Sequence, residues 1–340
     1  MMFPMLEPYL AANLPDFAGP LRIEQFRGGQ SNPTYLLDSG SGRYVLRKKP
    51  AGTLLPGAHQ IEREYRVMHA LTDTGVPLIR TRLLCEDPAV IGTPFYVMDF
   101  AEGRVFRNPS LPDQTPAERG AIYAEMASVM ARLHGVDWRA AGLEGFGKPT
   151  GYLARQIATW TRQYQASQTG PMSAMDALMG WLPAHIPADE VTTVAHGDFR
   201  LENLMFHAHE PRVIGVLDWE LATLGHPLAD LAYNCMAYHI DPSTPGFGGL
   251  LGRDLPALGI PSEAEYLRLY AQASGRDGIR DYAFFVAFGC FRFAAILQGV
   301  YARSLAGNAS QPEAAKYGAV APVFADLGWA AAEGRLILPA

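Results

Sequence analysis

Hydrophobic and polar positions follow two different patterns along the chain. In the first hundred residues the apolar runs are short. The segment NPTYLLDSGSGRYVLRK alternates around a Ser-Gly turn, which predicts strands at 35–37 and 44–47. Before a further strand candidate, TPFYVM, the segment IEREYRVMHAL repeats Ile61, Tyr65 and Met68 at helical spacing. This order predicts a small antiparallel sheet with one main helix packed against it.

Helical spacing dominates after the segment FAEGRVF. In TPAERGAIYAEMASVMARLHG, Thr115 and Glu118 have the spacing of a capping box at a helix start, and Gly135 ends the pattern. The segment SEAEYLRLYAQASG repeats this arrangement from Ser262 to Gly275. The chain is therefore predicted to be α+β, with a β-rich lobe followed by a larger and mostly helical lobe.

Composition narrows the classes of partner. With 340 residues, 49% of them hydrophobic, the chain can bury a large core, and its formal net charge of −6 provides no basic surface for nucleic acid or an anionic membrane. Cys85, Cys235 and Cys290 are far apart and lack CxxC spacing, so neither a disulfide framework nor a zinc site is indicated. A reducing, cytoplasmic location fits this cysteine usage. The N-terminal segment also lacks the features of a signal peptide.

The most apolar segment is YAFFVAFGCFRFAAILQGVYA. It is interrupted by Arg292 and flanked by Asp281 and Arg303. Its charges and length favour a buried core helix over a membrane span, so we expect no membrane partner.

Candidate chemistry is concentrated in the segment VAHGDFRLENLMF. It places Asp198 and Asn203 with four residues between them, before an apolar run, a polar turn and a second apolar run that ends at Asp218. This is the pattern of a hairpin. With the turn centred on Glu210 and Pro211, Asn203 falls opposite Asp218, and Asp198 lies in the loop close to the same end.

Oxygen ligands at one end of a hairpin suit Mg²⁺, which keeps waters and substrate phosphates in its other coordination positions. A further carboxylate within reach could accept a hydroxyl proton during phosphoryl transfer. The spacing of Asp198, Asn203 and the later Asp218 matches the protein-kinase catalytic loop and its magnesium aspartate. Each residue alone has a simpler interpretation, because Asp and Asn are also common in turns.

These segments, HGDFRLENLMF and GVLDWELATLGHPLADLAY, resemble the aminoglycoside phosphotransferase-like family of small-molecule kinases. GGQSNPTYLL, YVLRKKP and GTPFYVMDFAEGRVF extend the resemblance over most of the chain, which is most similar to the kinase-like region fused to some acyl-CoA dehydrogenases. The resemblance implies a two-lobed protein-kinase-like fold that binds ATP and Mg²⁺, with an N-lobe at 1–102 and a C-lobe at 103–340. It makes Asp198 the general base and Asn203 and Asp218 the metal ligands.

Two further residues near this loop have supporting interpretations. The resemblance makes Asp230 a carboxylate that supports the catalytic loop, although it could equally be a helix cap in HPLADLAY. His196 is interpreted as an orienting hydrogen-bonding group rather than an acid or base.

The nucleotide contacts are predicted from two loops. FRGGQSNPTYLL has paired glycines between strand candidates, although it lacks the full G-x-G-x-x-G of protein kinases and could be a simple turn. FYVMDFAEG ends a strand and enters the interlobe connection, where the main chain would meet the adenine. The predicted contacts are Gly28, Gly29, Gln30 and Ser31 in the first loop and Asp99, Phe100 and Ala101 in the second.

The strand YVLRKK supplies the candidate phosphate-binding cation. Aligning VLR with the kinase V-A-I-K strand makes Arg47 that cation, an Arg in place of Lys, while Lys48 and Lys49 remain alternatives. The partner of this cation on the following helix would be Glu64, with Glu62 as the alternative. A surface salt bridge is the simpler interpretation of either acid.

The acceptor would lie against the helical lobe. A polycationic aminoglycoside would require an acidic patch there, but in residues 236–305 the arginines match the acids in number. A neutral or anionic hydroxylated small molecule with an apolar part, such as a hydroxyacyl thioester, suits this composition better. Arginines paired with those acids would give the same composition.

The main functional hypothesis is an ATP-dependent phosphotransferase acting on a small-molecule hydroxyl. An aminoglycoside, amino-alcohol or sugar kinase is one alternative. A protein kinase is disfavoured because HGD replaces HRD, Asp218 precedes Trp-Glu rather than Phe-Gly, and no A-P-E segment follows. A non-catalytic, nucleotide-binding pseudokinase is the third alternative, although Asp198, Asn203 and Asp218 are all present.

Overall fold

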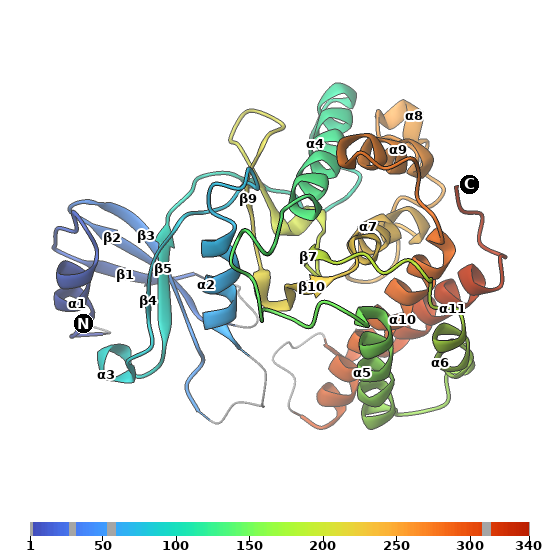
Figure 1. Ribbon diagram of the computed structural model, residues 1–340, viewed down its shortest axis with the longest axis horizontal. Coiled ribbons are helices and arrows are strands. Elements are labelled where there is room, and N and C mark those ends of the chain that lie inside the picture. Colours follow the sequence, from blue (N-terminus) through green and yellow to red (C-terminus); the bar gives the residue numbers. More distant parts are fainter. Residues whose placement is uncertain (1–2, 27–31, 53–58, 308–313, 340) are drawn as a thin grey trace.

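The computed structural model describes residues 3–26, 32–52, 59–307 and 314–339, which form an α+β protein with two lobes (Figure 1). The strands are β1 (Arg22–Gln25), β2 (Thr34–Ser39), β3 (Gly42–Lys48), β4 (Thr81–Cys85), β5 (Phe95–Asp99), β6 (Arg104–Val105), β7 (Thr193–Ala195), β8 (Leu204–Phe206), β9 (Val213–Val216) and β10 (Thr223–Gly225). The helices are α1 (Leu6–Asn13), α2 (Ile61–Ala70), α3 (Pro88–Ile91), α4 (Pro116–His134), α5 (Tyr152–Ser167), α6 (Ser173–Ala184), α7 (Pro227–Cys235), α8 (Leu255–Leu258), α9 (Glu263–Ser274), α10 (Tyr282–Leu305) and α11 (Tyr317–Ala332).

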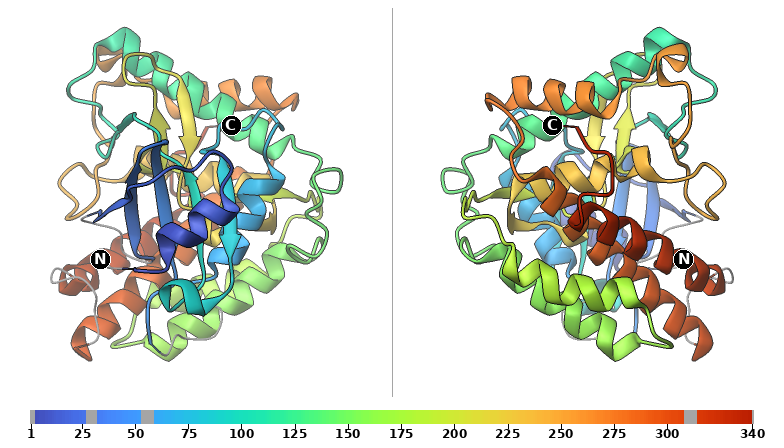
Figure 2. Two further views of the ribbon diagram at one scale, coloured as in Figure 1. Left: turned by 90° about the vertical axis from the view of Figure 1, so that its left-hand side faces the viewer. Right: turned by 90° about the vertical axis from the view of Figure 1, so that its right-hand side faces the viewer.

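The N-terminal lobe is a five-stranded antiparallel sheet in the order β1-β2-β3-β5-β4. The predicted hairpin is present as β2 and β3, and the predicted helix is α2. Residues of α1 and α3 pack with the strands into a separate small core, and Figure 2 shows α1 lying across the sheet on the side away from the helical lobe. The sequence did not predict these two helices.

The larger lobe is mostly helical and has its own core. Both predicted capping boxes are present, at the starts of α4 and α9. The segment containing Arg292 is α10, the one helix in the described residues that is long and apolar enough to cross a membrane. It is 78% buried over its most apolar window. The prediction of a core helix is therefore confirmed.

Helix α2 connects the two lobes. It contacts β4 and β5 of the sheet, yet its buried Val67 and Met68 belong to the large core of the helical lobe. Arg63 donates hydrogen bonds to the carbonyl oxygens of Phe146 (2.7 Å) and Ala222 (3.2 Å). These bonds fix α2 relative to the loops that carry the candidate catalytic residues.

Candidate functional site

The candidate catalytic loop follows β7 and is held by a buried carboxylate from α7. Asp230 accepts hydrogen bonds from the backbone N–H groups of His196 (2.6 Å) and Gly197 (2.9 Å). Gly197 adopts a φ of +82°, and an added Cβ there would lie 2.6 Å from the carbonyl oxygen of Leu221. The loop therefore needs glycine at this position, immediately before Asp198.

His196 is fully buried and contacts both sides of the site. Its Nδ1 accepts a hydrogen bond from the backbone N–H of Asp198 (3.2 Å), so its Nε2 donates to the carbonyl oxygen of Leu217 (2.9 Å). Its ring also packs edge-on against Trp219. This geometry agrees with an orienting role, because both ring nitrogens are bonded to the main chain.

Asn203 and Asp218 lie close together, but the predicted register was wrong by one residue. Leu204 pairs with Val216, and Asn203 faces Leu217 through a backbone hydrogen bond of 2.8 Å. Phe206 pairs with Val213, so the turn is centred between His209 and Glu210, one position earlier than expected. A register shift between Met205 and Phe206 offsets part of the resulting displacement. Asp218 then adopts a left-handed φ of +61° at the end of the hairpin.

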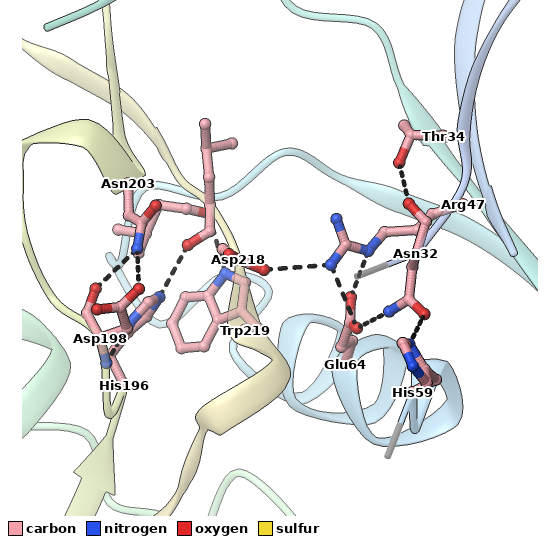
Figure 3. Close-up of polar contacts among 12 residues, drawn as sticks. Asn32, Thr34, Arg47, His59, Glu64, His196, Asp198, Asn203, Asp218 and Trp219 are labelled. Atoms are coloured by element: carbon pink, nitrogen blue, oxygen red, sulfur yellow. Dashed lines mark hydrogen bonds and ion pairs between the residues drawn. The ribbon is translucent and has the colours of Figure 1, made fainter. Parts of the chain in front are cut away.

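The side chain of Asn203 is oriented by Asp198. Its Nδ2 donates to both the carbonyl oxygen and Oδ2 of Asp198, each at 2.8 Å (Figure 3). With the amide nitrogen used in this way, the amide oxygen is the group that Asn203 can offer to a cation. Asp198 and Asn203 are thus placed together, as the sequence predicted.

Arg47 joins the two lobes across the site. Its Nη2 lies 3.1 Å from Oδ1 of Asp218, and its Nε lies 2.8 Å from Oε2 of Glu64 on α2 (Figure 3). Burial alone would lower the pKa of Arg47, but the neighbouring acidic groups, of which Glu64 contributes most and Asp218 is another, together outweigh this effect and raise that pKa. The guanidinium therefore stays charged, and it lies between the strand, the helix and the hairpin end.

Glu64 has two further partners that the sequence did not indicate. Its Oε1 accepts from Nδ2 of the buried Asn32 (2.8 Å), and its Oε2 accepts from the Tyr96 hydroxyl (3.2 Å). His59 in turn bonds Asn32 through Nδ1 at 3.0 Å. A four-residue side-chain network therefore fixes the partner of Arg47.

The two lysines considered as alternatives to Arg47 lie elsewhere. Lys48 points to the opposite face of β3, where its Nζ lies 5.2 Å above the ring of Phe3. Lys49 pairs with Glu62 at 2.5 Å. The alternation of the strand excludes Lys48, and Lys49 is engaged by Glu62, which leaves Arg47 as the cation beside Asp218.

The predicted nucleotide loops are described only in part. Gly28, Gly29, Gln30 and Ser31 lie outside the described residues. In the interlobe connection, the backbone N–H groups of Asp99 and Phe100 already donate to the carbonyl oxygens of Arg80 and Arg43. The Asp99 side chain is also engaged by Arg82. Any hydrogen bond from this segment to an adenine would thus use Ala101 or the carbonyl oxygens.

Two residues beside Asp198 were not predicted from the sequence. Arg200 places Nε 3.2 Å from Oδ1 of Asp198 and Nη1 2.7 Å from Oε1 of Glu202. Tyr233, on α7, has its phenol pKa raised first by burial and then by the Asp198 carboxylate. The position of Arg200, two residues after the aspartate in HGDFR, was a usable signal; nothing local marks Tyr233.

Replacing Asp230 with asparagine is expected to destabilise the fold. Burial would raise the pKa of Asp230, but the hydrogen bond and charge of His134 and the hydrogen bond from the Gly197 N–H hold that pKa below its usual value. The ionised form therefore stabilises the protein above the usual aspartate pKa, and this contribution is lost as pH falls through the lowered pKa. Hydrogen bonds to charged groups contribute about 1.5–3 kcal/mol, so a loss of about 2–3 kcal/mol in unfolding free energy is expected at neutral pH.

Urea unfolding over a series of pH values measures this effect. The difference between wild type and Asp230→Asn should shrink on acidification, whereas the exposed control Asp113→Asn should match wild type throughout. A difference independent of pH would show that the charge of Asp230 does not stabilise the loop.

Comparison with protein families and curated proteins extends these observations. The model described as "Phosphotransferase enzyme family" matches residues 22–282. Acyl-CoA dehydrogenase family member 10 of Mus musculus is 49% identical over 325 residues, which cover 95% of this chain and 30% of that protein. Acyl-CoA dehydrogenase family member 11 of Homo sapiens is 43% identical over 329 residues, covering 95% and 42%. The chain thus spans well under half the length of either relative.

Solved structures share the fold. A "putative aminoglycoside phosphotransferase" from Ralstonia eutropha JMP134 superimposes with a TM-score of 0.90 at 50% identity, covering 97% of this chain and 98% of that one. At 12% identity, a spectinomycin phosphotransferase in complex with ADP and spectinomycin has a TM-score of 0.64 and covers 99% of both chains. The two-lobed, kinase-like fold predicted from the sequence is confirmed.

Proposed function

The chain belongs to the phosphotransferase enzyme family and is a phosphotransferase with an alcohol group as acceptor; we propose that it transfers the γ-phosphoryl group of ATP, with Mg²⁺, to the hydroxyl of a small hydroxyacyl compound. The observation that carries this proposal is the convergence of Asp198, Asn203, Asp218 and the Arg47–Glu64 pair at the junction of the lobes.

The oxygen donors fit a magnesium ion only together with a nucleotide. In the part of the chain that the structure describes, no group of three or more His, Cys, Asp and Glu side chains forms a metal site. Asn203 and Asp218 would supply an amide and a carboxylate oxygen, and phosphate oxygens and waters would complete the shell, as Mg²⁺ requires. Bound there, the ion would neutralise charge on the β- and γ-phosphates.

Arg47 is proposed to bind the nucleotide phosphates. A guanidinium is always charged and presents several N–H donors, so it can contact Glu64, Asp218 and a phosphate oxygen together. The network of Asn32, Tyr96 and Glu64 would hold it in place before the nucleotide arrives. A spectinomycin phosphotransferase with the same fold binds ADP, which supports a nucleotide at this junction.

Asp198 is proposed to be the general base. Oδ2 accepts from Asn203 and Oδ1 lies by Arg200, so the carboxylate is oriented by two neighbours. In the reaction the acceptor oxygen bonds to the γ-phosphorus, the bond to the ADP oxygen breaks, and Asp198 takes the hydroxyl proton. Arg200, which lies beside Asp198, is proposed to contact the transferred group, so positioning and charge would supply most of the acceleration.

The hydroxyacyl acceptor is supported by two observations. The curated relatives are acyl-CoA dehydrogenase family members, and the chain matches only part of each of them. Residues 236–305 of the helical lobe also have no excess of acids over arginines, whereas a polycationic aminoglycoside would need an acidic patch.

The proposed function is tested by measuring ADP release from MgATP with a panel of acceptors. The panel contains hydroxyacyl thioesters, hydroxycarboxylic acids, amino alcohols, sugars and aminoglycosides, with a no-acceptor blank and a chelator control. Release that depends on both hydroxyacyl compounds and magnesium is expected. Turnover of aminoglycosides alone would replace the proposed acceptor, and ATP binding without transfer to any compound would favour a pseudokinase.

A further inference from the structure

Arg292 lies where three helices meet behind the candidate base. It projects from α10 and is only 6% exposed. Its guanidinium carbon lies 5.5 Å from the ring centre of Trp160 on α5 and 5.5 Å from that of Tyr233 on α7. Both helices pack against α10, and the guanidinium lies within cation–π distance of an aromatic ring from each of them.

This guanidinium has no anionic partner among the described residues. Its Nε is buried without a hydrogen-bond acceptor there, and no ion pair is formed with it in those ranges. Arg119, which is also buried, shows the usual arrangement: it donates to the carbonyl oxygens of Leu111, Pro112 and Leu258. Burying an unpaired charge is energetically costly, and contacts with aromatic rings offset only part of that cost.

Tyr233 connects this position to Asp198. Its ring contacts Arg292, and the charges of both Asp198 and Arg292 act on its phenol. The next residue, Asn234, donates to the carbonyl oxygen of Phe199 at 3.3 Å, which attaches α7 to the catalytic loop. A short acceptor with its hydroxyl at Asp198 could therefore extend along Tyr233 to Arg292.

We propose that Arg292 is an acceptor-binding residue, whose guanidinium donates hydrogen bonds to the acyl oxygens of the hydroxyacyl substrate. This inference rests on the proposed function and deepens it, because it assigns the recognition of the acyl group to one side chain. A planar fork of N–H donors matches a carboxylate or a thioester carbonyl oxygen. The aromatic rings of Trp160 and Tyr233 would line the apolar chain between the two ends.

The test compares acceptors that share a hydroxyl chain and differ at the other end. Straight-chain hydroxycarboxylic acids, their pantetheine thioesters and the alcohols without an acyl group are assayed with wild type, Arg292→Met and Arg292→Lys. In Arg292→Met, KM for acyl acceptors should rise at least about tenfold, the equivalent of 1.4 kcal/mol. KM for ATP and for the plain alcohols should stay unchanged. In Arg292→Lys, KM for the acyl acceptors should rise less than in Arg292→Met, because the charge remains. Comparison of the acids with the thioesters shows whether a carboxylate or a thioester carbonyl oxygen is bound.

A purely structural role for Arg292 would predict a lower unfolding midpoint in Arg292→Met. The proposal predicts the opposite, because replacing an unpaired buried charge by an apolar side chain should leave the unfolding midpoint equal or higher. The matched control Arg303→Met, on the same helix but exposed, should not change any KM. An equal rise in KM for alcohols and acyl compounds, or no rise at all, would overturn the role of Arg292. If the wild-type protein phosphorylated only the plain alcohols, the role of Arg292 in binding the acyl group would also be rejected. If it phosphorylated no acceptor, the proposed function itself would be rejected.

Discussion

Asp198→Asn is expected to lower kcat by about 10²–10⁴-fold while ATP still binds with nearly wild-type affinity. The substitution preserves the size of the side chain and can keep the contact of Oδ1 with Arg200, but it removes the atom that takes the hydroxyl proton. Asp198 does not contact Arg47 or Glu64, which are proposed to hold the nucleotide, so binding and chemistry should separate. Acceptor-dependent ADP release and MgATP titration by calorimetry measure the two quantities.

The control for this experiment removes a different carboxylate from the same hairpin. Glu210 pairs with Arg212 on the exposed turn between β8 and β9, and Glu210→Gln should have wild-type kcat. Near-normal kcat in Asp198→Asn would exclude Asp198 as the base. An equal loss in ATP affinity and kcat would instead indicate that the loop had been displaced.

The local parts of the fold were predictable because their signals are local. Capping boxes at Thr115 and Ser262 fixed two helix starts, and alternation in β3 separated Arg47 from Lys48. The catalytic loop was predicted for the same reason, since Asp198 and Asn203 are five residues apart and bond directly. The short helix α1 escaped detection because only Leu6 and Leu10 are buried in it.

The remaining contacts depend on tertiary structure. The one-residue error at Asp218 arose because the turn is centred one position earlier than expected, and a register shift in the hairpin offsets part of that displacement. Asn32 and Glu64 are 32 positions apart, and their hydrogen bond exists only because the sheet packs on α2. Arg292 was visible in the sequence as a charge that interrupts an apolar helix. Whether an acid pairs with it could be decided only from the packing of α5, α7 and α10.

Arg47→Met is expected to reduce kcat/KM for ATP by at least about 30-fold. Truncating one member of a buried charge pair costs about 2–5 kcal/mol, and 2 kcal/mol corresponds to that factor. The variant loses the contacts to Glu64 and Asp218 and the proposed contact to the phosphates. Arg47→Lys, which installs the residue that protein kinases use, should retain more activity because the charge remains.

Adjacent positions on β3 provide the matched control. Lys48→Met makes the same kind of change one residue away, but on the face occupied by Phe3, so kcat/KM should stay within a few-fold of wild type. Part of the loss in Arg47→Met could come from leaving Glu64 buried without its cation. The double variant Arg47→Met/Glu64→Gln separates the two causes: if activity stays low, the missing cation acts on the nucleotide. If kcat/KM of the double variant returned to near the wild-type value, Arg47 would serve only to neutralise Glu64. If Lys48→Met lost more kcat/KM than Arg47→Met, Lys48 would be the phosphate-binding cation instead.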